Sequence, residues 1–182
     1  MTKLEQLLDE IRACRICRDT PAGTVLPHEP RPVVQVSRDA KILIAGQAPG
    51  TRVHQSGRPF TDPSGDRLRN WMGVDNDVFY DEARIAIVPM GFCFPGLDKR
   101  GGDLPPRPEC ARQWRERLLS KLPSIKLILV IGQYAQAWHL GPLRQSSLTE
   151  TVMNWRQTYE TLSPPVIALP HPSWRNNTWL KN

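Results

Sequence analysis

Two short motifs hold the residues of this 182-residue chain that are best suited to chemistry. The first, Gly46-Gln47-Ala48-Pro49-Gly50, follows a mainly apolar segment at residues 41–45, and the second, His171-Pro172-Ser173, follows an apolar run at residues 166–169. A turn rich in glycine exposes backbone N–H groups that can meet a carbonyl or a phosphate oxygen, although an ordinary strand-to-helix turn has the same composition. A histidine at a strand end can donate a hydrogen bond to an oxygen that gains negative charge. The two motifs predict one site built from two loops.

Four cysteines form a second candidate site. Cys14 and Cys17 are spaced as C-x2-C, and Cys93 and Cys110 lie on either side of a basic, glycine-containing segment. Thiolates bind soft metals, and in an intracellular chain four cysteines favour a metal over disulfides. A 4Fe-4S cluster and a tetrahedral zinc ion accept the same four ligands, and four unrelated thiols are the remaining alternative.

The composition limits the kinds of protein that can carry these sites. With 182 residues, 40% of them hydrophobic, we expect a single domain spanning residues 1–182. The formal net charge of +6 favours an anionic partner, nucleic acid before an acidic membrane. Residues 1–10 lack the apolar core of a signal peptide, and the longest apolar run, residues 127–131, is too short to cross a bilayer. We expect a soluble, intracellular protein with no membrane association.

Apolar runs alternate with helical patterns along the chain. We predict strands at residues 41–45, 84–88, 127–131 and 166–169. We predict helices at residues 4–11, 64–72, 114–119 and 133–140, and a further helix opened by the capping-box residues 147–150. Ser64 is the expected N-cap of the second helix, Trp71 belongs to its expected buried face, and Gly73 should end it.

The order of these elements predicts the fold class. Strands that are apolar on both faces and alternate with helices indicate an α/β fold, specifically a three-layer α/β/α sandwich with a four-stranded, mainly parallel central sheet. Ligands of such sheets bind at the carboxyl ends of the strands. The loops after the first, second and fourth strands should therefore form one pocket.

The motifs together resemble those of the uracil-DNA glycosylase superfamily, and specifically its iron-sulfur branches, families 4 and 5. The resemblance covers most of the chain and also rests on the order of the four cysteines, on residues 57–65 and on Ile131-Gly132. It implies hydrolysis of the N-glycosidic bond of uracil in DNA, as a step of base-excision repair. It also implies a cytoplasmic monomer, associated with the nucleoid through DNA. It also implies a 4Fe-4S cluster held by Cys14, Cys17, Cys93 and Cys110, with a structural role.

The resemblance also suggests a role for individual residues. Phe60 would stack on the extruded base, and His171 would donate to its O2. Asp62 would stabilise the sugar cation or act on the attacking water, although an aspartate at this position can also cap the following helix. The first motif would contact the base, and Ser173, Trp174 and Arg175 would contact DNA, with Trp174 as a wedge and Arg175 on a phosphate.

Two positions depart from the family 4 pattern. Gln47 stands where that family usually has a glutamate, and Pro89 stands where it has an asparagine. The active centre therefore resembles family 5 more closely, which implies a tolerant pocket for uracil and deaminated purines such as hypoxanthine. Neither site motif contains a lysine, so we expect a monofunctional glycosylase without a Schiff-base nucleophile.

Two other functions remain open on the sequence. One is a protein of the same fold that binds damaged bases or single-stranded DNA and has weak or no catalytic activity, as the residues at positions 47 and 89 suggest. The other is a zinc-stabilised nucleotide-binding protein with no role on DNA. A basic surface that can meet DNA phosphates is expected from Lys99, Arg100, Arg107 and Arg112.

Overall fold

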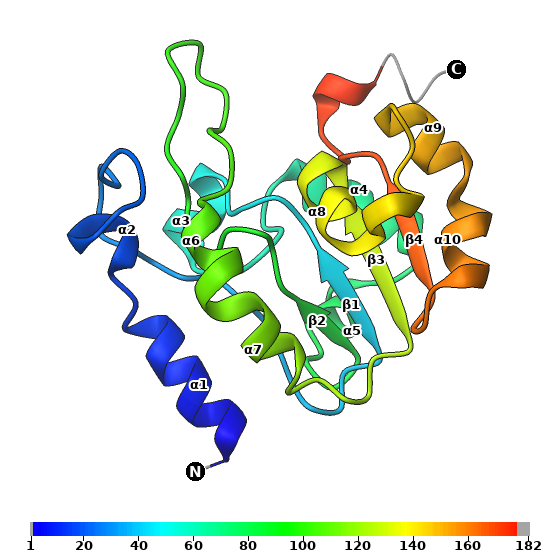
Figure 1. Ribbon diagram of the computed structural model, residues 1–182, viewed down its shortest axis with the longest axis horizontal. Helices are drawn as coiled ribbons and strands as arrows, with labels where there is room; N and C mark the ends of the chain where they lie inside the picture. Colours follow the sequence, from blue (N-terminus) through cyan, green and yellow to red (C-terminus); the bar gives the residue numbers. More distant parts are fainter. Residues whose placement is uncertain (1, 178–182) are drawn as a thin grey trace.

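Four parallel strands form the centre of the molecule. The computed structural model describes residues 2–177, except for the side chain of Arg175. The strands are β1 (Ile42–Ala45), β2 (Ile85–Ile87), β3 (Leu127–Ile131) and β4 (Val166–Leu169). They pair in the order β2-β1-β3-β4, and every pairing among the four is parallel (Figure 1). All four lie inside the predicted ranges, so the predicted α/β fold is confirmed.

Helices precede the sheet and connect its strands. Before β1 lie α1 (Lys3–Arg12) and α2 (Ile16–Asp19). Between β1 and β2 lie α3 (Thr51–Ser56), α4 (Pro63–Met72) and α5 (Asn76–Phe79). Between β2 and β3 lie α6 (Pro108–Cys110), the π-helical turn η1 (Ala111–Arg115) and α7 (Glu116–Leu119). Between β3 and β4 lie α8 (Gly132–Leu140), the 3₁₀ turn η2 (Gly141–Leu143), α9 (Leu148–Met153) and α10 (Trp155–Thr161), and the 3₁₀ turn η3 (Trp174–Asn176) follows β4.

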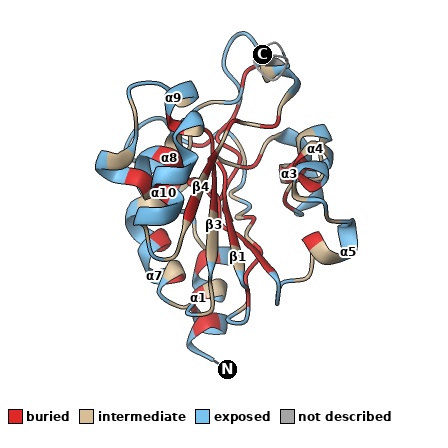
Figure 2. Ribbon diagram, turned by 90° about the vertical axis from the view of Figure 1, so that its right-hand side faces the viewer, coloured by how far each residue is buried: buried red, intermediate tan, exposed pale blue. Residues whose placement is uncertain are grey.

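The helices cover both faces of the sheet, so the molecule has three layers. Figure 2 shows α7, α8 and α10 on one side of the strands and α3, α4 and α5 on the other. Successive side chains of a strand point to opposite faces. Leu43 of β1 accordingly packs in a cluster with Leu118 of α7, whereas Ile44 packs in a cluster with Leu68 of α4. Among the described residues, no helix combines the length and the apolar character needed to span a membrane.

The N-terminus of α4 differs from the prediction. Asp62, rather than Ser64, is the N-cap, because its side chain accepts a hydrogen bond from the Gly65 N–H. Pro63 occupies the first turn, where its missing N–H costs no intrahelical hydrogen bond. The capping explanation for Asp62 is therefore realised in the structure, and any chemical role must be compatible with it.

Other differences concern exposure and short helices. Trp71 is 39% exposed rather than buried, because the buried stripe of α4 runs through Gly65, Leu68 and Arg69 and leaves Trp71 at its edge. The sequence does not predict α2, α3 or α5, which have 4, 6 and 4 residues. Helices of this length show too few turns for a periodic pattern. The predicted end of α4 at Gly73 is confirmed, with φ of 64°.

A buried arginine supports the end of β2. The Arg115 side chain is fully buried and donates hydrogen bonds to the carbonyl oxygens of Val88 (2.8 Å) and Pro89 (2.7 Å). Its Nη2 lies 2.6 Å from Nε2 of His139, near the end of α8. Because arginine only donates, His139 must accept through Nε2 and is therefore neutral. Burial, together with the charge of Arg115, lowers the pKa of His139 to about 3.

This histidine should make stability depend on pH. An unfolded histidine has a pKa of about 6.5, so between about pH 6.5 and about pH 3 the unfolded chain binds a proton that the folded chain does not. The free energy of unfolding should fall as the pH is lowered through this range, by about 2 kcal/mol from this residue at about pH 5. His139→Gln keeps an acceptor for Arg115 and cannot titrate. Urea unfolding at neutral pH and at about pH 5 should show a smaller loss in the variant, and equal losses would contradict this assignment.

Candidate active site

One pocket lies at the carboxyl ends of the strands, where the loops after β1, β2 and β4 meet. Its volume is about 580 Å³, including its open mouth. Ile87 and Pro89 reach it from the end of β2, and Val33 reaches it from the segment before β1. The predicted site residues that line it are Gly46, Gln47, Ala48, Pro49, Gly50, Phe60, Asp62 and His171. Residues from three separate loops are thus brought together, as the positions of the motifs predicted.

The deep end of the pocket is fixed by backbone hydrogen bonds. The Met90 N–H donates to the Gly46 carbonyl and the Gly91 N–H donates to the Gln47 carbonyl, each at 2.9 Å. These bonds extend the pairing of β1 with β2 into the two loops. Ile87 and Pro89 are both buried. The floor is therefore apolar and its backbone groups are already paired.

Phe60 adopts an unusual backbone conformation. Its φ is 54°, and it is the one non-glycine residue with positive φ in the described part of the chain. A bulky residue avoids this region unless its surroundings hold it there, and such strain is concentrated at functional sites. The ring faces the first motif, since a Cβ atom added to Gly46 would lie 3.6 Å from its Cζ. It also meets the Phe79 ring edge-on, with centroids 6.0 Å apart.

The Phe60 carbonyl is held from three sides. Nη1 of Arg69 and the hydroxyl of Tyr80 each donate to it at 3.2 Å. Gly65 allows α4 to approach, since a Cβ atom at this position would lie 1.9 Å from the Phe60 oxygen. Arg69 is buried and also pairs with Asp66. Gly65, Arg69 and Tyr80 thus fix the backbone of Phe60, and this places its ring in the pocket wall.

Asp62 and His171 approach the pocket from different elements. Oδ1 of Asp62 accepts from the Gly65 N–H at 3.1 Å, which fixes the carboxylate at the start of α4. The segment around His171 is held by Gln136, whose Nε2 donates to the Leu169 carbonyl at 3.0 Å, and by Asn176, whose Nδ2 donates to the His171 carbonyl at 2.7 Å. Both side chains therefore come from well-anchored backbone.

The other predicted DNA contacts lie outside the pocket lining. The Ser173 carbonyl accepts a hydrogen bond from Arg67 of α4 at 3.2 Å, which ties this loop to the helix capped by Asp62. Trp174 is 72% exposed. The side chain of Arg175 lies outside the described residues.

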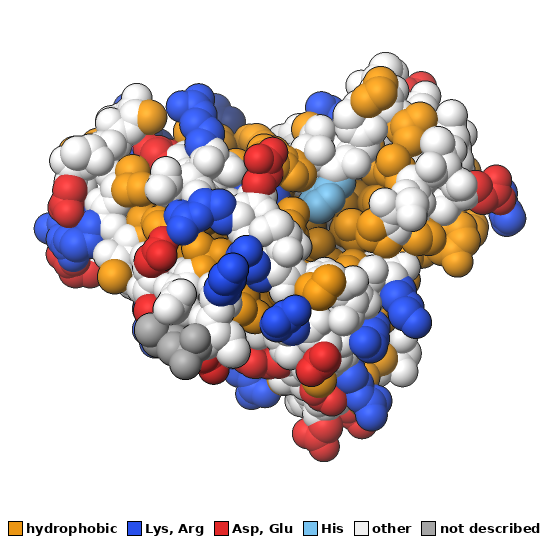
Figure 3. Space-filling view, turned by 60° about the horizontal axis from the view of Figure 1, so that its bottom comes forward, with side chains coloured by type: hydrophobic (Ala, Val, Ile, Leu, Met, Phe, Trp, Pro, Cys, Tyr) orange, Lys and Arg blue, Asp and Glu red, His pale blue; other side chains and the backbone are white. Residues whose placement is uncertain are grey.

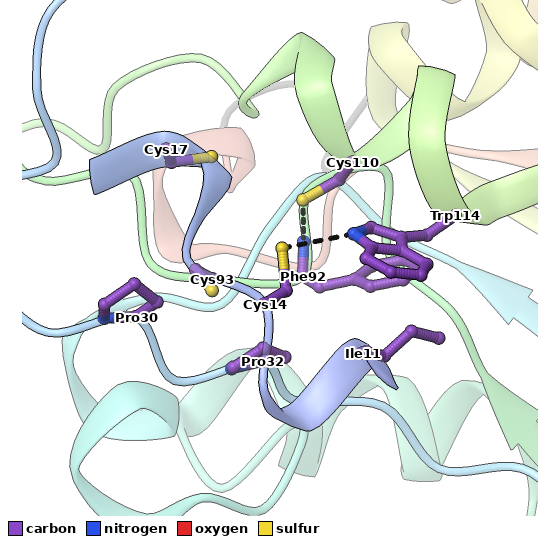
Figure 4. Close-up of a pocket in the computed structure, with 9 residues that line it drawn as sticks. All are labelled: Ile11, Cys14, Cys17, Pro30, Pro32, Phe92, Cys93, Cys110 and Trp114. Atoms are coloured by element: carbon purple, nitrogen blue, oxygen red, sulfur yellow. Dashed lines mark hydrogen bonds between the residues drawn. The ribbon is translucent and has the colours of Figure 1, made fainter. Parts of the chain in front are cut away.

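The four cysteines surround a second, smaller cavity. Cys14, Cys17, Cys93 and Cys110 all line it, together with apolar side chains such as Trp114. Figure 4 shows the four thiols arriving from three separate segments of the chain. Two sulfurs accept hydrogen bonds: Cys110 from the Phe92 N–H at 3.3 Å and Cys14 from the Trp114 indole N–H at 3.2 Å. In the described residues, no three His, Cys, Asp or Glu side chains are arranged as ligands of a single metal ion.

The cysteine thiols are in an environment that disfavours isolated thiolates. Burial raises the pKa of Cys93 to about 12. The hydrogen bond with Cys110, and then burial, raise the pKa of Cys17 well above its usual value. Without a positive partner, the cavity therefore keeps these two groups protonated.

Arg31 links the cysteine cavity to the pocket. Its Nη1 donates to the carbonyl oxygens of His54 (2.9 Å) and Gln55 (2.8 Å), at the end of α3. Two residues later, the Val33 N–H donates to the Phe92 carbonyl at 2.7 Å, and Val33 lines the pocket. A single extended segment therefore contacts the residue beside Cys93, the helix after the first motif and the pocket itself.

Comparison with known families adds an independent observation. Residues 33–182 match the family model described as Uracil DNA glycosylase superfamily. The chain belongs to the uracil DNA glycosylase superfamily. As a member of this superfamily it is a DNA glycosylase in the general sense, a hydrolase of base-excision repair that acts on bases in DNA. The predicted membership is thus confirmed at the level of the superfamily.

The structure of this superfamily member also contains residues that sequence reasoning missed. Asp103 lines the pocket although it lies in the loop between Cys93 and Cys110. Val33 and Val53 also line it. No spacing or periodicity in the sequence connects these residues to the motifs. The paths of the segment before β1 and of the loop after β2 bring Val33 and Asp103 there, and Val53 reaches the pocket from the short helix α3.

The predicted basic surface is distributed over several elements. Lys99 and Arg100 are exposed in the loop after β2, and Arg112 is exposed on η1. Arg107 instead donates to the Thr24 carbonyl. Figure 3 shows Lys and Arg side chains spread over the face it draws rather than gathered in one patch.

The contact between Gly65 and Phe60 can be tested by adding one methyl group. Gly65→Ala places a Cβ atom against the Phe60 backbone, so α4 must shift. We expect the free energy of unfolding to fall by about 2–3 kcal/mol, measured from the urea midpoint at unchanged slope. Gly23→Ala is the matched control, because an added Cβ there meets nothing within 4 Å. Equal stability of the two variants would show that the close approach is not required.

Proposed function

We propose that this glycosylase hydrolyses the N-glycosidic bond of uracil in DNA, as a monofunctional enzyme of the iron-sulfur type that resembles family 5. The observation that carries the proposal is the single pocket that gathers Phe60, Asp62 and His171 at the carboxyl end of the sheet. These side chains match the three needs of the reaction: a surface for the extruded base, a negative charge near the sugar and a donor for the leaving group.

The mechanism follows from the chemistry of these groups. The extruded uracil stacks on Phe60 and its O2 accepts a hydrogen bond from His171. As the bond between C1′ and N1 breaks, its electron pair moves to the base, and His171 stabilises the resulting anion. The negative charge of Asp62 stabilises the sugar cation. Water then adds at C1′ and leaves an abasic site.

Contacts outside the pocket support binding of DNA. Trp174 is exposed beside the loop that carries His171, where an aromatic wedge can occupy the space left by the extruded base. Ser173 and Arg175 belong to the same part of the chain and contact the sugar-phosphate backbone of the DNA. No lysine is among the described residues that line the pocket, which supports hydrolysis without a Schiff base. The protein acts on single- or double-stranded DNA as a monomer.

A second candidate function is binding of damaged bases without cleavage. Gln47 and Pro89 both line the pocket. Position 47 therefore has a neutral amide in place of the glutamate of family 4, and position 89 lacks the asparagine side chain of that family. The resemblance to family 5 also implies hypoxanthine as an alternative base. An oligonucleotide cleavage assay distinguishes binding from cleavage, and uracil from hypoxanthine as the preferred base.

Cleavage of labelled oligonucleotides tests the proposal. Strands with one uracil, one hypoxanthine or no damaged base, single-stranded and duplex, are incubated with protein and treated with alkali to reveal abasic sites. We expect cleavage at uracil, and a loss of about 100-fold or more in single-turnover rate for His171→Ala. Binding without cleavage of any strand would favour the second function.

Asp62 can be tested without losing its cap. Asparagine caps helices as well as aspartate does, so Asp62→Asn keeps the start of α4 and removes only the charge. We expect it to cleave about 100-fold more slowly with little change in DNA affinity. Asp62→Ala removes both cap and charge. If Asp62→Asn cleaves normally and only Asp62→Ala is impaired, the residue has a capping role alone.

The four cysteines fit a 4Fe-4S cluster. Thiolates are the usual ligands of such clusters, and N–H donors to the sulfurs, like those of Phe92 and Trp114, are a normal part of their surroundings. The four thiols that line one cavity are a complete ligand set for such a cluster, and a tetrahedral zinc ion would accept the same set. When bound, the cluster supplies a cross-link between the N-terminal segment and the loop after β2. The metal content of the purified protein distinguishes the cluster from a zinc ion.

Metal analysis of the purified protein tests the cluster. We expect a coloured protein with iron and acid-labile sulfide in equal amounts, and loss of both in Cys93→Ser. Glu109→Gln is the control, because it alters a buried side chain next to Cys110 and leaves the thiols in place. A colourless protein with one zinc ion would establish a structural zinc site. A folded protein without metal would contradict both the cluster and the zinc site.

A further inference from the structure

The loop between Cys93 and Cys110 carries a hairpin. Leu97 and Asp103 form an antiparallel bridge, and the Leu104 N–H donates to the Gly96 carbonyl at 3.0 Å. At the tip, Oδ1 of Asp98 accepts from the N–H groups of Arg100 and Gly102, both at 2.8 Å. Figure 1 shows this part of the chain projecting from the body above α6. The position of Asp103 is therefore fixed by main-chain hydrogen bonds at the base of the hairpin.

Asp103 returns from this hairpin to the pocket. It lines the same pocket as Asp62 and His171, and a Cβ atom added to Gly50 would lie 3.7 Å from its Oδ2. The residue is exposed, whereas Ile87 and Pro89 of the same lining are buried. Asp103 therefore belongs to the mouth of the pocket. An extruded base enters first and its sugar stays attached to the strand outside, so C1′ lies on the mouth side of the base.

The pocket lining contains two carboxylates, and the cap of α4 sets the position of one of them. Asp62 has Oδ1 bound to the Gly65 N–H, so its orientation is set by α4. A fixed anion stabilises a neighbouring cation through space and need not move a proton. Removal of a proton from water requires a carboxylate oxygen within hydrogen-bond reach of that water. Asp103 brings a second carboxylate to the mouth from a different element.

We propose that Asp103 is the general base that activates the attacking water, an inference that rests on the proposed glycosylase function. In this step the water oxygen forms a bond to C1′ and one water proton passes to a carboxylate oxygen of Asp103. The electron pair of the broken C1′–N1 bond has already moved to the base. The proton then leaves Asp103 to solvent and the base anion takes up a proton, so that the products are an abasic sugar and the neutral base.

Single-turnover cleavage of the uracil-containing strand tests this role. Asp103→Asn should lower the rate by about 100-fold or more and leave the affinity for DNA within about threefold. Asp103→Ala should be equally slow, and added formate should raise its rate, because formate supplies a carboxylate in the space left by the side chain. Formate should not raise the rate of Asp103→Asn, whose amide fills that space.

A control variant on the same hairpin distinguishes the loss of one negative charge from the loss of a general base. Asp98→Asn removes one negative charge and keeps an acceptor oxygen for the tip, so it should cleave at nearly the wild-type rate. Cleavage by Asp103→Asn at the wild-type rate would overturn the inference and leave the glycosylase function intact. A slow Asp103→Ala that formate does not rescue would also overturn it, since that result means a structural role. A wild-type protein that cleaves no strand would remove both the function and the inference.

Discussion

The parallel pairing of β1 with β2 and β3 is the constraint on which the site depends. Ile44 lies opposite Ile87 on one side and Leu129 on the other, so the three strands end at the same edge of the sheet. The hydrogen bonds from Met90 and Gly91 carry this register into the loops. The loops after β1 and β2 therefore cannot move apart without breaking the ladder, and the floor of the pocket is as rigid as the sheet.

The sequence was sufficient to predict the strands and the place of the pocket. Strands buried on both faces are nearly continuous apolar runs, which is why β3 and β4 were predicted to the residue. A parallel sheet brings the following loops to one edge, so Gly46 and His171 were predicted to meet. The remaining features depend on contacts between distant residues. No pattern in neighbouring residues predicts three of these features: the positive φ of Phe60, the burial of Arg115 and the position of Asp103 in the pocket lining.

The cysteine cavity and the pocket share their supporting segments. Cys93 and Cys110 bracket the hairpin that carries Asp103, and the segment of Arg31 and Val33 contacts both regions. A cross-link between the cysteines fixes the ends of a long loop, which otherwise has high conformational entropy. The proposed cluster would therefore act mechanically, by holding the hairpin and Val33 against the pocket.

The charges around the pocket have a polarity that suits cleavage of an N-glycosidic bond. Arg115 lies beneath the floor and donates to the Pro89 carbonyl, so a buried positive charge is close to the deep end. Asp62 and Asp103 bring negative charges to the walls and the mouth. When the N-glycosidic bond breaks, electrons move from the sugar to the base. The base, at the deep end of the pocket, becomes negative, and the sugar, at the mouth, becomes positive. Of these charges Arg115 is buried, so it acts on the deep end with little screening, whereas solvent screens the charges of Asp62 and Asp103 more strongly. This polarity favours the charge-separated transition state over the neutral substrate.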